Sequence, residues 1–256
     1  MKKRIDVLLV ERGLAESRAQ AQALVMAGLV RGHSKAGEQV DEASALEIEA
    51  PPPYVSRAGH KLANALDAFG VDVAGLDCLD VGASTGGFTD CLLKRGAAHV
   101  VALDVAYGEL DWGLRNDPRV TVVERANARE LEPRILPYAP DLVVVDVSFI
   151  SLLKVLPAVL RASAGEFDCL ALVKPQFEVG RERVGKGGVV RSAEARREAL
   201  VAVGRAMADA GWSVLGFASS ELPGPAGNRE SFVWLAEPDR DGSAPDVEAA
   251  AREVEP

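Results

Sequence analysis

Cysteine and histidine are scarce in this chain, with three of each among 256 residues, and no Cys-x-x-Cys pair occurs. The cysteines Cys78, Cys91 and Cys169 lie in apolar stretches, so we expect buried, reduced thiols and no disulfide framework. So few ligands of this kind also argue against a zinc site, and we predict no metal. These two shortages exclude the small disulfide-rich and zinc-finger classes.

Long apolar runs are absent as well. No run approaches the ~20 residues that a helix needs to cross a bilayer. The basic first residues are followed at once by Asp6, Glu11 and Arg12, which a secretory signal would not contain. We therefore expect a cytoplasmic protein with no membrane segment.

The formal net charge of −9 conceals an uneven distribution. Residues 1–35 hold seven basic residues against three acidic ones, whereas the last twenty residues hold seven acids against two arginines. Local charge decides whether a phosphate backbone is attracted, so the basic start permits RNA binding, although a solvated helical surface explains it equally well. The stretch 238–256 has too few apolar residues to bury, and we expect it to be disordered.

The first 50 residues form a small α+β unit in this interpretation. One helix begins near Ile5 and ends at Gly13, and a second begins at Ser17, where a capping box is expected, and runs to Gly28. Short strand-like pieces follow around residues 30, 40 and 46–48. Three consecutive prolines then predict a stiff linker over residues 51–57.

The remainder alternates between strand and helix patterns, which indicates a parallel sheet covered by helices on both faces. The last two strands are joined without a helix and predict an antiparallel hairpin. We therefore expect an α/β domain over residues 58–237, with a Rossmann-like, mostly parallel sheet. The expected strands are 76–81, 98–104, 120–124, 141–147, 168–174, 212–219 and 231–236, and the expected helices are 58–69, 87–95, 107–115, 151–162 and 192–210.

A glycine-rich turn follows the first of these strands, and such a loop lets a ligand approach the backbone. The segment Gly82-Ala83-Ser84-Thr85-Gly86 matches the Gly-x-Ser-x-Gly pattern of serine hydrolases. That chemistry requires a histidine after the nucleophile and an acid between them, but only His99 follows, at the start of the next strand. We therefore regard this match as chance.

A dinucleotide site requires Gly-x-Gly-x-x-Gly, whose second glycine admits a pyrophosphate. Ser84 occupies that position here, so a ligand without a pyrophosphate, such as S-adenosylmethionine, fits better. Asp80 is expected to orient the amino-acid end of that cofactor, Asp104 to accept hydrogen bonds from its ribose, and Asn127 to meet its adenine. The further cofactor-binding candidates are Gly82, Ala83, Ser84, Gly86, Gly87, Phe88 and Asp146.

Four polar residues fall around the crevice where the strand ends converge: Lys61, Asp146, Lys174 and Glu230. Each alone has an ordinary explanation as a helix-surface, strand-end or loop residue. Lys174 is the hardest to explain in that way, because a lysine that closes a buried strand is costly unless it is paired.

These motifs together resemble the TlyA family, named as haemolysin A or ribosomal RNA methyltransferase, with a catalytic domain of the FtsJ ribose 2′-O-methyltransferase type. The N-terminal unit resembles the S-four RNA-binding domain. The resemblance covers about residues 3–237, with departures at Ala58, where glycine is expected, and at Gly32-His33-Ser34, where Val-Asn-Gly is common. The matching segments are Asp80-Val-Gly-Ala-Ser-Thr-Gly-Gly-Phe-Thr-Asp90, Asp146-Val-Ser-Phe-Ile-Ser151, Val173-Lys-Pro-Gln-Phe-Glu178, Gly185-Lys-Gly-Gly-Val-Val-Arg191, Gly227-Asn-Arg-Glu-Ser-Phe232 and, in the first unit, Ser17-Arg18 through Ala27-Gly28-Leu29-Val30.

The resemblance implies ribose 2′-O-methylation of ribosomal RNA, at cytidines, with S-adenosylmethionine as the methyl donor. It also implies that Lys61, Asp146, Lys174 and Glu230 form the catalytic tetrad, with Lys174 as the base. A non-catalytic RNA-binding or assembly factor remains the alternative, and a membrane-lytic haemolysin has no support in the sequence. The expected RNA contacts are Lys3, Arg4, Arg18, Arg31, Lys35, Arg57, Arg181, Arg183, Lys186 and Arg191.

Overall fold

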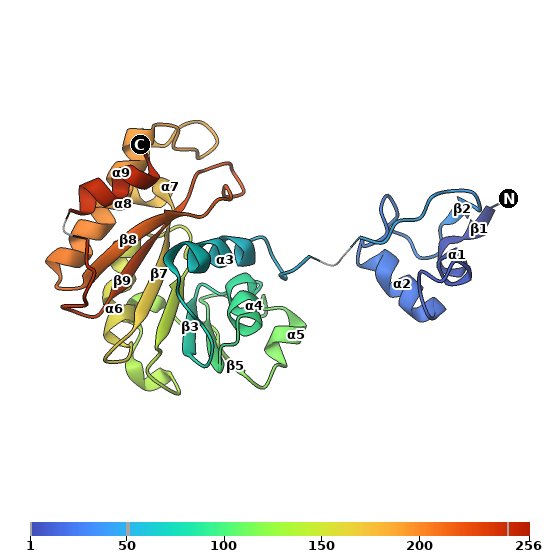
Figure 1. The fold of residues 1–256 in the computed structure, drawn as a ribbon, viewed down its shortest axis with the longest axis horizontal. Helices are drawn as coiled ribbons and strands as arrows, with labels where there is room; N and C mark the ends of the chain where they lie inside the picture. Colours follow the sequence, from blue (N-terminus) through green and yellow to red (C-terminus); the bar gives the residue numbers. More distant parts are fainter. Residues whose placement is uncertain (1, 50–51, 245) are drawn as a thin grey trace. The chain divides into compact units, whose positions relative to one another are not determined.

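The computed structural model describes residues 2–49, 52–244 and 246–256. The chain divides into two compact units, Met1–Pro53 and Tyr54–Pro256 (Figure 1). Residues 50 and 51, at the end of the expected first domain and the start of the expected linker, lie outside the described residues.

The smaller unit combines two helices with a two-stranded sheet. Helix α2 begins after Ser17, whose hydroxyl accepts a hydrogen bond from the Gln20 amide at 3.2 Å, while the Gln20 side chain accepts one from the Glu16 amide. The strand Lys2–Arg4 was not expected, because three consecutive basic residues carry no apolar alternation. The elements are β1 (Lys2–Arg4), α1 (Ile5–Glu11), α2 (Arg18–Met26) and β2 (Gln39–Asp41), and β1 pairs with β2 in antiparallel register.

The larger unit is built on a seven-stranded sheet in the order β5-β4-β3-β6-β7-β9-β8. Strands β3 to β7 are parallel, and β9 is antiparallel to both β7 and β8. The expected fold class, a mostly parallel sheet with an antiparallel C-terminal hairpin, is confirmed. The strands are β3 (Asp77–Val81), β4 (His99–Leu103), β5 (Val120–Val123), β6 (Leu142–Val145), β7 (Asp168–Val173), β8 (Ser213–Ser219) and β9 (Ser231–Ala236).

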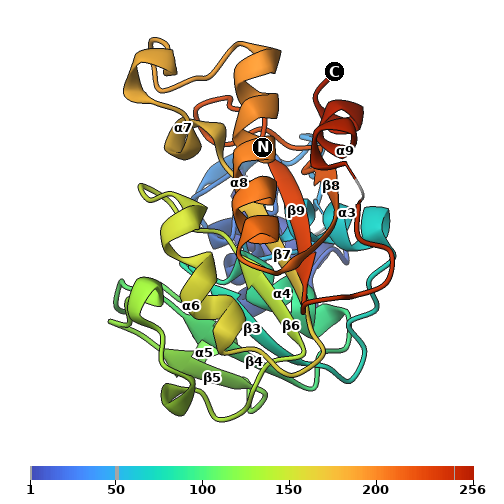
Figure 2. The same cartoon turned by 90° about the vertical axis from the view of Figure 1, so that its left-hand side faces the viewer.

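Helices cover both faces of this sheet (Figure 2). Side chains of α3, α4 and α5 form one apolar core with the sheet, and those of α6, α8 and α9 form the other. The helices are α3 (Ala58–Phe69), α4 (Gly87–Lys94), α5 (Trp112–Arg115), α6 (Leu156–Arg161), α7 (Pro175–Glu178), α8 (Ala193–Asp209) and α9 (Val247–Val254).

Two expected helices are shorter than the pattern indicated. The helix expected over 107–115 begins only at Trp112, because the Asp111 side chain caps it by accepting from the amides of Gly113 and Leu114. The helix expected over 151–162 is divided into a 3₁₀ turn at Leu152–Lys154 and α6. Both differences leave the strand ends, and therefore the crevice, in place.

The expectation of a disordered tail over 238–256 is wrong for the described residues of that segment. Helix α9 forms there, with Ala251 fully buried in the core against α8. The Glu255 carboxylate lies 2.7 Å from the Arg196 guanidinium, and both side chains are buried. The acidic composition did not reveal that one acid has a buried cationic partner 59 positions earlier.

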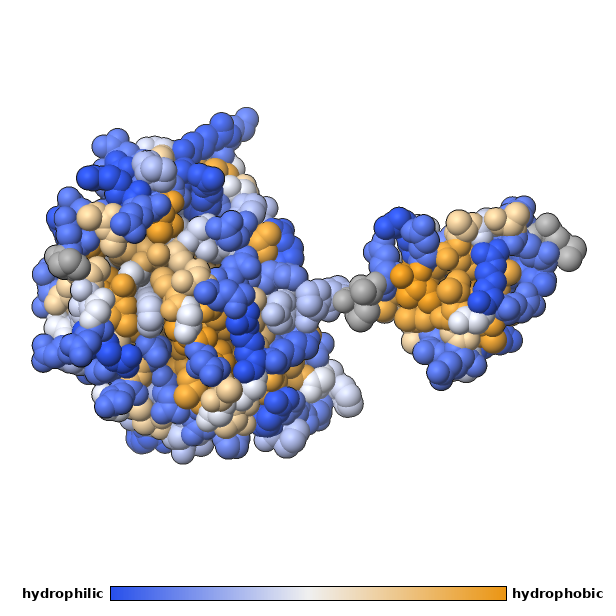
Figure 3. All heavy atoms as spheres, viewed as in Figure 1, coloured by the Kyte–Doolittle hydropathy of each residue, from blue (hydrophilic) through white to orange (hydrophobic). Residues whose placement is uncertain are grey.

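Polar and apolar residues are interspersed over the visible faces of both units (Figure 3). Among the described residues, no helix has the length and apolar character that a bilayer crossing requires. The same residues contain no cluster of three or more metal-ligating side chains. Cys78, Cys91 and Cys169 are all buried thiols, and burial raises the pKa of Cys91 to about 11.

Candidate active site

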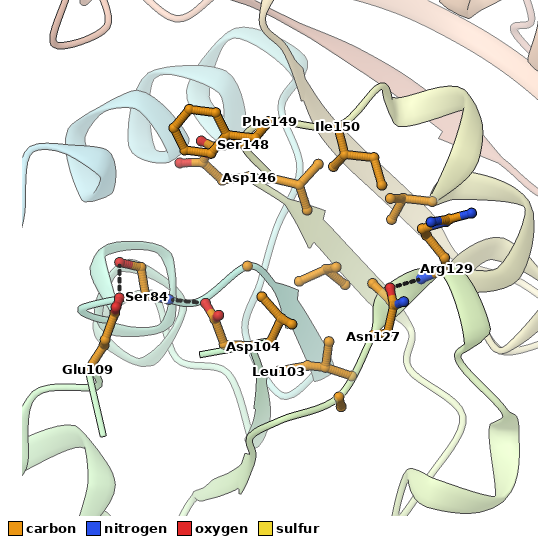
Figure 4. Close-up of a pocket in the computed structure, with 17 residues that line it drawn as sticks. Ser84, Leu103, Asp104, Glu109, Asn127, Arg129, Asp146, Ser148, Phe149 and Ile150 are labelled. Carbon is orange, nitrogen blue, oxygen red and sulfur yellow. Dashed lines mark hydrogen bonds between the residues drawn. The ribbon is translucent and has the colours of Figure 1, made fainter. Parts of the chain in front are cut away.

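A cavity of about 540 Å³ opens at the carboxyl ends of β3, β4 and β6 (Figure 4). Figure 4 shows Asp104 and Asn127 on one side of it and Asp146, Ser148 and Phe149 on the other. In parallel α/β sheets, ligands bind outside the carboxyl ends of the strands, and pockets of this volume hold cofactor-sized molecules. The cavity is therefore the first candidate for a cofactor site.

Asp104 follows β4 and its carboxylate is held by the backbone. Its Oδ2 accepts from the Ser84 amide at 2.7 Å and its Oδ1 accepts from the Ala106 amide at 2.8 Å. A carboxylate offers about four acceptor positions, so further donors, such as two ribose hydroxyls, fit the same group. Ser84 adopts the left-handed φ of 47° that brings its amide to Asp104, and its hydroxyl donates to Glu109.

Asn127 follows β5 and lines the same cavity. Its side-chain oxygen accepts from the Arg129 amide at 3.2 Å, which leaves its NH₂ group as the donor toward a ligand. A donor at this position suits a ring nitrogen of adenine. Asn127 therefore lies where the sequence placed it, beside the cavity.

Asp80 lies within β3 and is fully buried, so it does not line the cavity as its neighbour Val81 does. Its Oδ2 accepts from the amide and the hydroxyl of Thr89, at 2.9 and 2.7 Å. Its Oδ1 is buried without a hydrogen-bond partner among the described residues. Burial raises the pKa of Asp80 to about 7. An ammonium group, or a water molecule that bridges to one, would satisfy this oxygen.

The glycines of the loop are needed first for the packing of the chain itself. Gly82 has a φ of +87°, and a Cβ there would lie 2.5 Å from the backbone oxygen of Asp146. Side chains at Gly86 and Gly87 would overlap Leu114 and Ser56. The loop is thus fixed between neighbouring segments, and close approach by a ligand is not needed to explain its composition.

The four expected catalytic residues form two ion pairs. The Lys61 Nζ lies 2.5 Å from the Glu230 Oε2, and only 8 and 1% of the two side chains are exposed. The Lys174 Nζ lies 2.5 Å from the Asp146 Oδ1 and donates to the Ser148 hydroxyl at 2.8 Å. Lys174, which the sequence indicated to be costly to bury without a partner, therefore has a carboxylate partner, and so does Lys61.

The Lys174–Asp146 pair lies between two hollows. A second cavity of about 170 Å³ is lined by both of these residues and by the glycine loop, Ser56 and Ala58. Asp146 also lines the larger cavity, so it borders both. Lys61 and Glu230 line neither of the two. A group bound in the larger cavity and a group bound in the smaller one would meet at this pair.

The cationic candidates of the smaller unit are largely neutralised within it. Arg4 donates to the buried Asp6 at 2.8 and 3.0 Å, Arg18 donates to it at 3.0 Å, and Gln22 donates to it at 2.7 Å. Hydrogen bonds from Arg4 are the main reason that the pKa of Asp6 is lowered. Both arginines remain about half exposed, so their outer edges are still accessible to a phosphate.

Two further cations of that unit have acidic partners that the count over residues 1–35 left out. These acids lie in the second half of the unit. The pairing of β1 with β2 and the bridge between Val30 and Ile48 place that half beside the basic first half. The excess of positive charge in residues 1–35 is therefore not the charge of the folded unit. The pairs with acids beyond residue 35 are Lys3 with Glu42, and Arg31 with Glu47 and Glu49; Lys3 also pairs with Glu11, which the count included.

In the larger unit, Arg183 pairs with Glu198, and Arg57 donates to the carbonyl of Pro223 at 3.1 Å. Three other expected RNA contacts of this unit lie in one segment: Arg181 begins a 3₁₀ turn, and Lys186 and Arg191 lie in the loop after it. The remaining one, Lys35, lies in a loop of the smaller unit. Sequence reasoning missed Phe149, although it lies in the quoted motif after Asp146. It is 91% exposed, lines the large cavity and packs near Phe177.

Comparisons with known proteins give a family match for each of the two units. The FtsJ-like methyltransferase family matches residues 54–237, and the S4 domain matches residues 3–31. The chain is 51% identical to the 16S/23S rRNA (cytidine-2′-O)-methyltransferase TlyA of Mycobacterium tuberculosis, over 96% of this chain and 95% of that protein. It is 39% identical to Hemolysin A of Brachyspira hyodysenteriae, over 89 and 97%. A solved structure from Streptococcus thermophilus, named as a hemolysin, has 39% identity and a TM-score of 0.74, over 98 and 95%.

Proposed function

The chain belongs to the TlyA family of FtsJ-like methyltransferases, and we propose on this premise that it methylates the ribose 2′-hydroxyl of cytidines in ribosomal RNA. The S4 domain supports RNA as the substrate class. Ribosomal subunits would then be its partners, and its localisation would be cytoplasmic.

The observation that carries the proposal is the position of the Lys174–Asp146 pair between the two cavities. Methyl transfer needs the acceptor hydroxyl in line with the methyl group of the donor and within reach of a group that can take its proton. The larger cavity suits the donor in volume, and the smaller one has room for the acceptor sugar beside the amine. Proximity and alignment of this kind supply much of the rate in such reactions.

S-adenosylmethionine, when bound, supplies a methyl group on a positively charged sulfur that departs as a neutral thioether. Two residues that line the cavity fit it, Asp104 for the ribose and Asn127 for the adenine. The unpartnered Oδ1 of the buried Asp80, which does not line the cavity, would reach the ammonium end through a bridging water molecule. This is the cofactor that we propose for the larger cavity.

Lys174 is the proposed base. As the ribose oxygen bonds to the methyl carbon and the bond from that carbon to sulfur breaks, the hydroxyl proton passes to the Lys174 Nζ. Lys174 can take this proton only in its uncharged form, so the pair with Asp146 has to give up one proton before the transfer. The Asp146 carboxylate, 2.5 Å from that nitrogen, stabilises the ammonium that the transfer creates. The Ser148 hydroxyl accepts a hydrogen bond from the same amine and restricts its rotation.

Lys61 and Glu230 support this arrangement from a deeper position. The ion pair joins the first turns of α3 to the residue before β9, two segments 169 positions apart. We propose that the pair holds these segments, and with them the wall of the acceptor site, in register.

The test is methyl transfer from labelled S-adenosylmethionine to ribosomal subunits that lack the modification. We expect transfer to cytidine 2′-oxygens by the wild type and a loss of at least about 100-fold for Lys174→Ala. The exposed Lys154, on the 3₁₀ turn, provides a matched control, and Lys154→Ala should transfer normally. Cofactor binding without transfer to any RNA would contradict the proposal and favour a non-catalytic assembly factor.

A further inference from the structure

The C-terminal helix is fastened to the larger unit by a buried arginine. The Arg196 Nε donates to the Glu255 Oε1 at 2.8 Å and its Nη2 donates to the Oε2 at 2.7 Å. Only 9 and 5% of the two side chains are exposed. Figures 1 and 2 both show α9 beside α8, which carries Arg196. Two parallel, charge-assisted hydrogen bonds of this kind fix both position and orientation.

The third corner of the same guanidinium holds a loop. The Arg196 Nη1 donates to the carbonyl of Arg191 at 2.8 Å and to that of Val190 at 3.4 Å. These carbonyls end the glycine-rich segment 185–191, which carries Lys186 and Arg191. One side chain therefore connects the end of the chain to a basic loop.

Asn228 anchors this loop from the other side. Its Oδ1 accepts from the Val190 amide at 2.8 Å, and its Nδ2 donates to the Gly188 carbonyl at 2.8 Å. Only 1% of Asn228 is exposed, and it lies two positions before Glu230 of the buried ion pair. The loop is therefore held between the C-terminal helix and the turn that leads into β9.

A glycine-rich loop without these anchors would sample many conformations, and ordering it on contact with a ligand would cost conformational entropy. Anchors that order it beforehand remove this cost from binding. Neither Glu255 nor Arg196 lines either cavity at the carboxyl ends of the strands, so they have no direct route to the donor.

We propose that Glu255 and Asn228 are positioning residues for the RNA substrate, acting through the loop 185–191. The inference rests on the proposed function, in which the cations of this loop contact the phosphate backbone. The tail thus sets the affinity for RNA, while binding of the donor and the chemical step are independent of it.

The test compares Glu255→Gln with Glu253→Gln in the full chain. Both remove one negative charge from the end of the chain, but Glu253 is exposed and Glu255 is buried. We expect Glu255→Gln to raise KM for ribosomal subunits about five- to tenfold, because the substitution weakens one buried, charge-assisted hydrogen-bond network. The kcat and the Kd for S-adenosylmethionine should remain unchanged. Glu253→Gln should match the wild type.

The sign of the effect separates positioning from simple electrostatics. Loss of a negative charge by itself would attract RNA more strongly and lower KM, and would do so for both variants. Hydrogen exchange gives a second readout: the amide of Val190 should exchange faster in Glu255→Gln and in Asn228→Asp, which loses the donor to Gly188, than in Glu253→Gln.

The outcomes are distinguishable. Transfer by the wild type with an unchanged KM in Glu255→Gln, or a loss in kcat alone, contradicts the positioning role and leaves the proposed function standing. Absence of transfer by the wild type contradicts the proposed function itself, while faster exchange at Val190 still shows whether Glu255 orders the loop.

Discussion

Removal of one partner from the Lys61–Glu230 pair should cost much more than removal of both. At 2.5 Å, the gross attraction is roughly 7 kcal/mol with an effective dielectric constant near 20, and taking each ion out of water costs several kcal/mol. The intact pair is therefore nearly neutral for stability. Glu230→Gln leaves a buried ammonium beside a neutral amide, and we expect a loss of about 3 kcal/mol in the free energy of unfolding.

The double variant Lys61→Met/Glu230→Gln removes the unpaired charge and should recover about 2 kcal/mol of that loss. Urea unfolding followed by tryptophan fluorescence measures this directly, because all three tryptophans lie in the larger unit. Methyl transfer should remain impaired in the double variant, since the uncharged pair does not hold the acceptor wall in the same register.

Two results would refute this reasoning. The first compares the losses in the free energy of unfolding caused by Lys61→Met alone and by Glu230→Gln alone with the loss in the double variant. If the two single losses sum to the double loss within about 0.5 kcal/mol, the residues do not interact energetically as the distance implies. If the double variant regains full methyl transfer, the pair contributes stability alone and has no part in the active site.

Three further predictions concern the loop, the buried acid and the smaller unit. Gly82→Ala should lower the free energy of unfolding by roughly 2–4 kcal/mol in urea titrations, because the new Cβ overlaps the Asp146 backbone at a positive φ; an unchanged midpoint would contradict this. The raised pKa of Asp80 means that its ionisation opposes folding, so between pH 5 and 7 the wild type should lose roughly 2 kcal/mol relative to Asp80→Asn; parallel pH profiles would exclude it. The lowered pKa of Asp6 stabilises the smaller unit above about pH 4, and this contribution is lost as the pH falls. The hydrogen-exchange protection factors of α1 amides should therefore fall between pH 5 and 3 more in the wild type than in Asp6→Asn.

The sheet could be predicted because its strands are continuous apolar runs. The run Leu142–Val145 is fully buried on both faces, and such a run has few alternatives to a central parallel strand. Of the polar residues at the ends of these strands, Asp104 and Asp146 line the larger cavity, whereas Asp80 does not. Lys174 and Asp146 meet because β6 and β7 are neighbours in the sheet.

The remainder depended on partners distant in sequence. Glu255 looks like one acid in a solvated tail until its bidentate contact with Arg196 is known. The positive charge of residues 1–35 looks available for RNA until β2 brings back the acids that pair with it. Composition records how many charges a segment has, whereas the fold decides which of them remain unpaired.

Mass-spectrometric mapping of ribosomal RNA from cells with and without this protein tests the central claim most directly. The account predicts that one or more cytidines carry a 2′-O-methyl group only when the protein is present, and that Lys174→Ala fails to restore it. Identical ribose methylation in the two RNA preparations would contradict it.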